Sequence, residues 1–398
     1  MHYDHDYFAH ARIGLFTHYA YGTYNKENNY GSTWHSAADK SPAADSEEAA
    51  SLLDAKKFAE AAADMGAQYV VFTLCHAGFN LLFPSETMAA TGLTNKYSKT
   101  DAVKSLLDEL DKFGIPLILY MPPNDNHDLK PHELEAMGWQ TNDGRELFIN
   151  TLLDEIGRRY SGRVAGFWFD QGGPRASALE VIRRHNPDAV VYINTGVTAN
   201  ENQHPLSNFL VSEYYGTFPE GDSDTFPVHH SQVNRIFGGS WWACGKAALT
   251  DARSLYRYMI RTIAVTGQLN SGINYACGPY LDQTWETGVR EIMHDFGELV
   301  RKNAYAICDT VPGKSFVTSP SSTLGKSQWG VSTESRDGKH VYLHILNLPE
   351  NGILDIGESA DGRKFSAAYL GDTQLEFDGQ RIVLPDGCDP IDTVVTLV

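Results

Sequence analysis

Short apolar runs alternate with amphipathic segments from residue 12 to about residue 305. Runs rich in β-branched and aromatic residues predict strands at residues 13–18, 69–74, 116–121, 164–170, 190–194, 209–214, 236–242 and 273–276. Between them, apolar residues recur at three- and four-residue spacing, as in 55–65 and 101–113, which predicts helices. Asp54 is placed as an N-cap, and Gly66 and Gly114 are placed to end these helices.

Eight strands that alternate with helices predict an α/β fold. The pattern favours a (β/α)8-type, TIM-like barrel over residues 1–312, with active-site residues at the carboxyl ends of the strands. A doubly wound open sheet is the alternative. After residue 312, short strand-like runs at 340–346, 364–370, 373–384 and 392–398 are separated by turn residues. They predict a small C-terminal antiparallel β-sandwich over 313–398.

Charge and cysteine usage narrow the function classes. A formal net charge of −18 without a Lys/Arg cluster argues against nucleic acid or an anionic membrane as partner. No apolar run has the roughly 18 residues that a membrane span needs. The five cysteines match neither a CxxC metal site nor a disulfide framework, and the N-terminus lacks a signal-peptide pattern. We therefore expect a cytoplasmic protein, or a secreted one if a leader was removed. The oligomeric state stays open, a homo-oligomer included.

Polar side chains follow most of the predicted strands, where barrel enzymes carry their active sites. They are His18, Cys75, His76, Tyr120, Asp170, Asn194, Glu213 and Trp241. Asp170 ends the apolar run Gly166-Phe167-Trp168-Phe169. The pattern alone leaves two interpretations of Asp170 open: a carboxylate presented at the barrel mouth, or a cap of the next helix.

Glu213 is the candidate partner of Asp170, because it ends another apolar run two strands further along. Retaining glycosidases use one ionised carboxylate as nucleophile and a second carboxyl group as acid and then base, about 5–5.5 Å apart. Aromatic neighbours such as Trp168 would favour a protonated Glu213. Glu220 is a rival for this role, and an ordinary exposed carboxylate is the other interpretation of Glu213.

Several segments together resemble the family 29 glycoside hydrolases, the retaining α-L-fucosidases. They are residues 12–20, 54–58, 66–79, 167–170, 213–214, 238–242 and 270–279. Each segment is a weak signal alone, but their common order over residues 12–310 is specific. The resemblance implies that Asp170 is the nucleophile and Glu213 the acid/base, acting on a small oligosaccharide or glycoside.

The remaining candidate residues are expected to contact the sugar. They are His18, Trp34, Cys75, His76, Tyr120, Trp168, Asn194 and Trp241. No cofactor is expected. No metal is expected either, because the sequence shows no chelating His pair with further ligands.

One motif departs from the family pattern. Where the family has His-His-Asp, this chain has Cys75-His76-Ala77. Because a thiol is a poor hydrogen-bond donor, one sugar hydroxyl would be held less well, or a different substituent would fit. An α-L-galactosidase or an α-L-glucosidase is therefore an alternative on the same scaffold. A catalytically silent sugar-binding protein is the alternative from another class, and a metal-dependent barrel hydrolase is a third.

Overall fold

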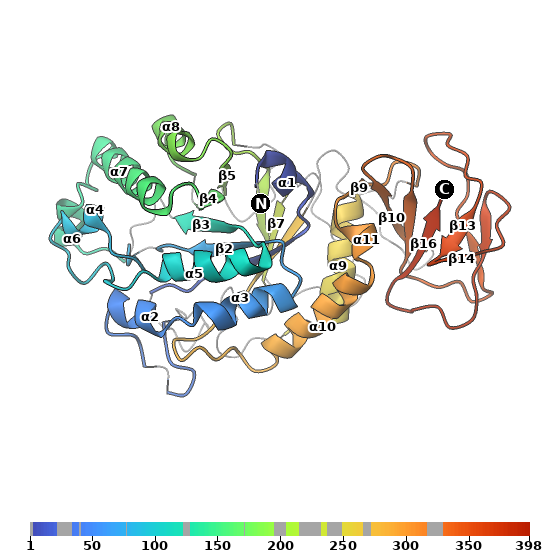
Figure 1. The fold of residues 1–398 in the computed structure, drawn as a ribbon, viewed down its shortest axis with the longest axis horizontal. Coiled ribbons are helices and arrows are strands. Elements are labelled where there is room, and N and C mark those ends of the chain that lie inside the picture. The colour runs from blue at the N-terminus through green and yellow to red at the C-terminus, as the bar shows by residue number, and fades with distance from the viewer. Residues whose placement is uncertain are drawn as a thin grey trace.

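The computed structural model describes residues 3–21, 34–39, 41–76, 78–121, 128–170, 172–194, 204–214, 232–236, 249–265, 272–316 and 329–398. An N-terminal part of parallel strands and surrounding helices lies beside a C-terminal part of antiparallel strands, and helices α9, α10 and α11 lie between the two (Figure 1).

The N-terminal strands form one parallel sheet. They are β1 (Ile13–Thr17), β2 (Tyr69–Thr73), β3 (Leu117–Met121), β4 (Gly166–Phe169), β5 (Val190–Ile193), β6 (Val211–Tyr214), β7 (Gln232–Ile236) and β8 (Gly272–Ala276). Their order is β5-β4-β3-β2-β1-β8-β7-β6, and a parallel bridge between Tyr192 and Phe209 joins β5 to the residues just before β6. The sheet thus closes on itself. The predicted barrel is confirmed, and the doubly wound alternative is wrong.

The structure contains a strand at residues 232–235 that the sequence did not predict. β7 covers Gln232–Ile236 and pairs in parallel with β8 from Gln232–Gly272 to Ile236–Ala276. Of the predicted strand 236–242, residues 237–242 lie outside the described residues. The β7 sequence Gln-Val-Asn-Arg-Ile is mostly polar. β7 pairs with β6 on one side and with β8 on the other. This pairing, rather than intrinsic strand propensity, therefore determines the strand.

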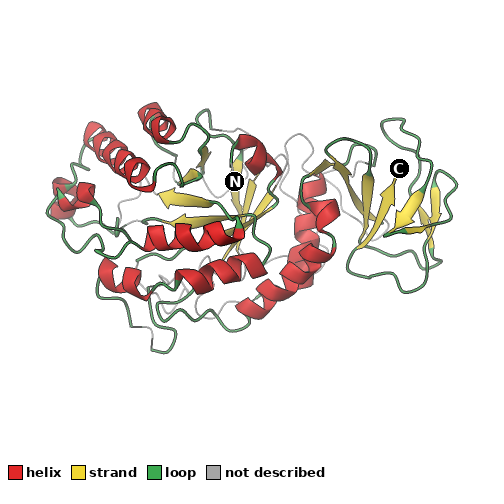
Figure 2. Ribbon diagram, in the orientation of Figure 1, coloured by secondary structure: helices red, strands yellow, loops and turns green. Residues whose placement is uncertain are grey.

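Helices cover the outside of the barrel (Figure 2). The α-helices of the described residues are α1 (His5–His10), α2 (Ser46–Leu52), α3 (Ala55–Asp64), α4 (Glu86–Ala89), α5 (Ala102–Leu110), α6 (Pro131–Ala136), α7 (Asn142–Tyr160), α8 (Ala176–His185), α9 (Ala252–Val265), α10 (Val289–Lys302) and α11 (Ala304–Ile307). Of these, α1 packs Phe8 into the barrel interior rather than onto its outside. The Asp54 carboxylate accepts from the Lys57 amide, which confirms the predicted N-cap of α3. Gly66 and Gly114 follow their helices with φ of 78° and 67°, a region that favours glycine. Within the described residues, no helix has the length and apolar character needed to cross a membrane.

Side chains of the strands divide between two apolar clusters because they alternate along each strand. Phe16, Tyr120, Trp168 and Tyr192 belong to a cluster in the barrel interior, whereas their sequence neighbours belong to the large cluster that contains the inner faces of the helices. Any polar residue that continues the inward series past a strand end therefore lies at the barrel mouth.

The C-terminal part contains antiparallel strands. They are β9 (Thr310–Pro312), β10 (Gly330–Ser335), β11 (Val341–Ile345), β12 (Ile353–Asp355), β13 (Ala368–Leu370), β14 (Thr373–Gln374), β15 (Arg381–Val383) and β16 (Thr393–Leu397). Six form the sheet β14-β13-β16-β11-β10-β9, and β12 pairs with β15. The predicted sandwich is confirmed, although the run 373–384 is split into β14 and β15. The division after residue 312 stays a prediction, and β9 already pairs with the antiparallel sheet.

A buried polar network joins the two parts. Asp392 accepts a hydrogen bond of 2.7 Å from the Tyr256 hydroxyl of α9, and the His344 Nδ1 atom of β11 lies 2.9 Å from the same carboxylate oxygen. Arg257 of α9 donates to the Leu346 carbonyl at 2.6 Å. Since buried polar groups are costly to leave unpaired, these contacts hold the antiparallel sheet in a defined position against α9.

Candidate active site

Five predicted site residues lie at or just beyond the carboxyl ends of neighbouring strands. His18 follows β1, His76 follows β2, Tyr120 lies near the end of β3, Asp170 follows β4 and Asn194 follows β5. The two-residue period of a strand explains part of this grouping. His18, Asp170 and Asn194 each come two positions after an inward-facing aromatic residue, so their side chains continue the inward series.

The Asp170 carboxylate is held by its two neighbouring strands. The Tyr120 hydroxyl donates to Oδ2 at 2.9 Å, and the Asn194 amide donates to Oδ1 at 2.7 Å. The Asp170 N–H also donates to the carbonyl of Met121 at 3.1 Å. Both carboxylate oxygens thus act as acceptors, and the group cannot rotate without losing a bond.

The helix-capping interpretation of Asp170 is wrong. The next helix, α8, has Arg175 at its N-cap and no side-chain hydrogen bond there. Because the carboxylate oxygens accept from β3 and from the residue after β5 instead, Asp170 is presented at the barrel mouth.

Two imidazole rings and a phenol ring lie together beside this carboxylate. The His76 ring stacks on the Tyr120 ring, with centroids 5.7 Å apart and planes 8° apart. The His18 ring is edge-on to both, at 5.8 Å from His76 and 5.4 Å from Tyr120. His18, His76 and Tyr120 thus form one continuous group that connects to Asp170 through the Tyr120 hydroxyl.

Trp168 packs beneath these groups in the barrel interior. It is 1% exposed, edge-on to Phe16 at 5.1 Å and stacked on Tyr192 at 5.3 Å. This packing restricts the rotamers of the interior aromatic residues. Trp168 therefore supports the residues at the mouth, and its predicted contact with a sugar stays a prediction.

His18 is kept neutral by its surroundings. Burial lowers the pKa of its imidazole well below the ordinary value of 6.5, and the neighbouring His76 lowers it further. A neutral imidazole has one donor and one acceptor nitrogen, so it can bind a hydroxyl group in either direction.

Cys75 and Trp34 are placed differently from the residues around Asp170. The Cys75 thiol is 2% exposed and belongs to the outer cluster with Leu74 and Phe79. Its burial raises the pKa of the thiol, which disfavours a reactive thiolate. Trp34 is buried against Tyr19 and Tyr21, at 6.2 and 5.9 Å. For both residues, direct contact with a sugar stays a prediction.

The predicted acid/base lies at the edge of what the structure describes. The backbone of Glu213 is in β6, paired in register with Asn234 of β7, whereas its side chain lies outside the described residues. Glu220 and Trp241 also lie outside them. Within the described ranges, no group of three His, Cys, Asp or Glu side chains could hold a metal ion.

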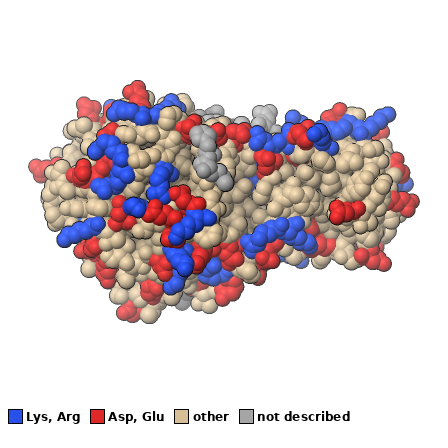
Figure 3. Space-filling view, in the orientation of Figure 1, with Lys and Arg blue, Asp and Glu red and all other residues tan. Residues whose placement is uncertain are grey.

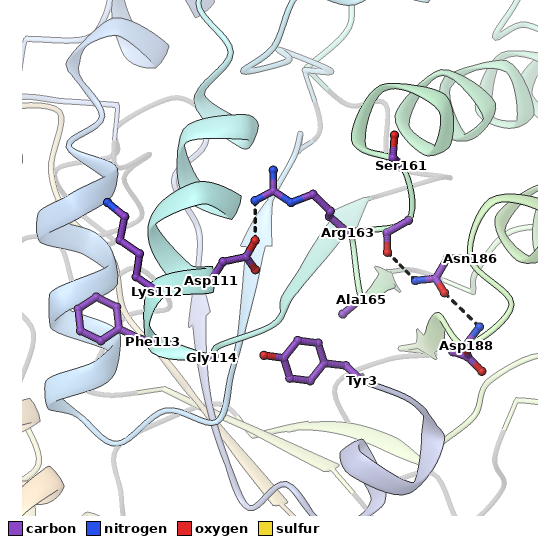
Figure 4. A pocket seen from close by; sticks show the side chains of 11 residues that line it. Tyr3, Asp111, Lys112, Phe113, Gly114, Ser161, Arg163, Ala165, Asn186 and Asp188 are labelled. Carbon is purple, nitrogen blue, oxygen red and sulfur yellow. Dashed lines mark hydrogen bonds and ion pairs between the residues drawn. The ribbon is translucent and has the colours of Figure 1, made fainter. Parts of the chain in front are cut away.

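A hollow of about 790 Å³ lies at the opposite end of the barrel, near the amino ends of β3, β4 and β5 (Figure 4). Its polar side chains bond mainly to protein groups. Arg163 donates to Asp111 at 2.6 Å, and Asn186 donates to the Gly162 carbonyl at 3.1 Å while it accepts from the Asp188 amide. None of the predicted site residues that the structure describes lines this hollow. On the face shown in Figure 3, Lys and Arg side chains are interspersed with Asp and Glu.

The sequence did not predict the hydrogen bonds that Tyr120 and Asn194 make to Asp170. Both side chains donate to the Asp170 carboxylate, and their expected contact with a sugar stays a prediction. Tyr120 precedes Asp170 by 50 positions and Asn194 follows it by 24. Only the parallel order β3-β4-β5 brings them together, and no local motif signals it.

Comparison with known proteins gives one family. The family model described as Alpha-L-fucosidase matches residues 3–304. No curated protein matches the chain significantly in sequence.

Solved structures with a similar fold include several α-L-fucosidases. An enzyme from Bacteroides thetaiotaomicron superposes with a TM-score of 0.70 at 16% identity, covering 99% of this chain and 94% of that one. Isoenzyme 1 from Paenibacillus thiaminolyticus gives 0.68 at 16% identity over 99% and 98% of the two chains. The Thermotoga maritima enzyme gives 0.66 at 16% identity over 98% and 96%. At such identities the likeness shows the fold alone.

The low pKa of His18 predicts how its ring titrates. As pH falls below 6.5, His18 in the folded protein should keep the imidazole ¹⁵N chemical shifts of a neutral ring. His294, whose pKa is raised by its hydrogen bond to Asp64, should already be protonated and serves as the internal reference. Below pH 6.5 the unfolded chain binds a proton at His18 that the folded chain does not bind. The contribution of His18 to the free energy of unfolding should therefore decrease as the pH is lowered. Spectra of His18→Gln assign the signals, and protonation of His18 near 6.5 would contradict the prediction.

Proposed function

The chain belongs to the α-L-fucosidase family, and on that premise we propose that Asp170 is the nucleophile that attacks the anomeric carbon of a terminal α-L-fucose. The retaining, fucose-releasing glycoside hydrolase predicted from the sequence motifs agrees with this membership. The roles of individual residues and the choice of sugar are our proposal. One relative from Bacteroides thetaiotaomicron was captured as a trapped covalent intermediate with 2-fluoro-fucosyl fluoride, which supports a covalent step here too.

The observation that carries the proposal is the restraint of Asp170 by Tyr120 and Asn194. A nucleophile reacts fast only when its attacking atom is held close to the reacting carbon in the right direction. Two hydrogen bonds from neighbouring strands provide that restraint before substrate binds. They also leave Asp170 partly exposed at the mouth, where a sugar can reach it.

The proposed reaction is a double displacement with Glu213 as the second carboxyl group. In the first step an Asp170 oxygen forms a bond to the anomeric carbon, the glycosidic C–O bond breaks, and Glu213 gives its proton to the leaving oxygen. In the second step Glu213 takes a proton from water, the water oxygen attacks the same carbon, and the Asp170 carboxylate leaves. Two inversions give net retention of configuration.

We further propose that His18 and His76 bind sugar hydroxyl groups. They lie beside the Tyr120 ring at the mouth, and a neutral His18 can both donate and accept. The sequence pattern alone supports the other proposed contacts with the sugar, which are Trp34, Cys75, Trp168 and Trp241. Fucose carries a methyl group where L-galactose carries a hydroxymethyl group, so L-galactosides and L-glucosides are the competing substrates to compare.

We propose that the enzyme works in a reducing compartment, the cytoplasm. The four described cysteines, Cys75, Cys277, Cys308 and Cys388, are free thiols. Free thiols are usual where glutathione keeps cysteines reduced.

The nucleophile is tested by Asp170→Gly. The variant should lose turnover of aryl α-L-fucosides, because no covalent intermediate can form. Added azide should restore cleavage and give a β-L-fucosyl azide, because a single displacement inverts the anomeric carbon. Product configuration is measured by NMR. Asp188→Gly, at the opposite end of the barrel, is the control and should behave like the wild type. Wild-type hydrolysis by Asp170→Gly would rule out the assignment.

The acid/base is tested by Glu213→Gln against Glu220→Gln. Loss of the acid should slow substrates with poor leaving groups by roughly 10²–10⁴-fold. Activated aryl fucosides, which need no protonation, should lose much less in the first step. A plot of log(kcat/KM) against leaving-group pKa should therefore be steep for Glu213→Gln and near the wild-type slope for Glu220→Gln. The opposite pair of slopes would assign the role to Glu220.

A further inference from the structure

A buried ion pair lies behind the turn that carries His76. The Lys96 Nζ atom, in the segment between α4 and α5, is 3.3 Å from a carboxylate oxygen of Glu133 in α6. The two residues are 6% and 4% exposed. Taking both charges out of water costs several kcal/mol per ion, and a buried pair often stabilises a fold no better than apolar residues would. Stability alone is therefore a poor explanation for this pair.

Glu133 is anchored on the α6 side. Its other carboxylate oxygen accepts from the Lys130 N–H at 2.8 Å, which satisfies the N-cap amide of α6. Burial acts to raise the pKa of Glu133, but the Lys130 N–H and the Lys96 ammonium outweigh it, and the pKa is lowered. Glu133 thus presents a charged and immobile partner to Lys96.

Lys96 reaches from this anchor to the residues after β2. Its Nζ donates to the Gly78 carbonyl at 2.9 Å. The backbone of the same segment runs alongside, because the Leu81 N–H donates to the Lys96 carbonyl at 2.7 Å. The Lys96 ammonium therefore contacts both the Glu133 carboxylate and the carbonyl of Gly78, two residues beyond His76.

The residues after His76 form a tight and strained turn. The Phe79 N–H donates to the His76 carbonyl at 2.8 Å, and Phe79 has a φ of 49°, in the left-handed region that a non-glycine residue rarely adopts. Such a conformation costs on the order of 1–3 kcal/mol and persists only where its surroundings enforce it. Packing of the buried Phe79 ring on Trp139 and Phe148, at 4.7 and 6.0 Å, is one restraint, and the Lys96 bond to Gly78 is another.

Gly78 also lies where neighbouring mouth loops come together. A Cβ atom at this position would be 3.7 Å from the Asp128 Cβ and 3.8 Å from the Tyr21 ring. Asp128 leads into α6 and Tyr21 follows β1. The Lys96–Glu133 pair therefore joins the turn after β2 to the chain that follows β3.

We propose that Lys96, held by Glu133, is a positioning residue that sets the place of His76 at the barrel mouth. The inference rests on the proposed function, in which His76 binds a sugar hydroxyl. Because the His76 ring stacks on Tyr120, and Tyr120 donates to Asp170, a displaced His76 alters both the sugar contact and the environment of the nucleophile.

The test is the paired variant Lys96→Met/Glu133→Gln. It removes both charges together, so no uncompensated buried charge is left to unfold the protein, and it deletes the donor to Gly78. The expected result is a loss of about 10- to 100-fold in kcat/KM for an aryl α-L-fucoside with the melting temperature kept near that of the wild type. The matched control is Lys56→Met/Glu60→Gln, the same replacements at an exposed pair of α3, which should leave kcat/KM unchanged.

A double-mutant cycle with His76→Ala separates positioning from a merely structural role. If the pair acts through His76, its removal in the His76→Ala background should change kcat/KM less than about twofold, because coupled residues are not additive. Equal fold losses in both backgrounds, or no loss in the wild-type background, would overturn the proposal. Failure of the wild-type chain to hydrolyse any α-L-fucoside would instead overturn the proposed function, so the two failures are distinguishable.

Discussion

Parallel, in-register pairing of β3, β4 and β5 is the constraint on which the site depends. Tyr120, Trp168 and Tyr192 are register partners across these strands, and so are Met121, Phe169 and Ile193. One position further on, Asp170 and Asn194 lie side by side just past the ends of adjacent strands, and the Asn194 amide donates to the Asp170 carboxylate. The long Tyr120 side chain reaches this carboxylate from within the barrel. A shift of one residue in β4 would turn Asp170 toward the helices and place Phe169 at the mouth.

The rest of the molecule keeps this arrangement in place. Interior aromatic residues fill the barrel beneath Asp170, and the bridge from Tyr192 to Phe209 closes the sheet. At the mouth, the strained turn after β2 is held from behind by Lys96 and Glu133, at some cost in free energy. The antiparallel sheet is joined to the barrel through the hydrogen bond between Asp392 and Tyr256 of α9.

Much of this could be predicted from the sequence because it is local. Alternation of buried strands with amphipathic helices gave the barrel, and cap residues such as Asp54 gave helix ends. The part of β7 before residue 236 was not predicted, because its own residues are mostly polar and only its neighbours make it a strand. The strand pattern alone left Asp170 ambiguous between a helix cap and a presented carboxylate, and its partners in the structure exclude the cap. Those partners, and the Lys96 contact with Gly78, join residues 18 to 50 positions apart, and no sequence period encodes such contacts.

The central claim is that Asp170 becomes covalently bonded to the sugar, and trapping the intermediate tests it most directly. The wild-type enzyme is incubated with 2-fluoro-fucosyl fluoride, digested with trypsin and analysed by mass spectrometry. The label should add the mass of one 2-fluorofucosyl group to the peptide of residues 164–175, in which Asp170 is the only carboxylate side chain. A label on the peptide of residues 185–235, which contains Glu213 and Glu220, would contradict the account.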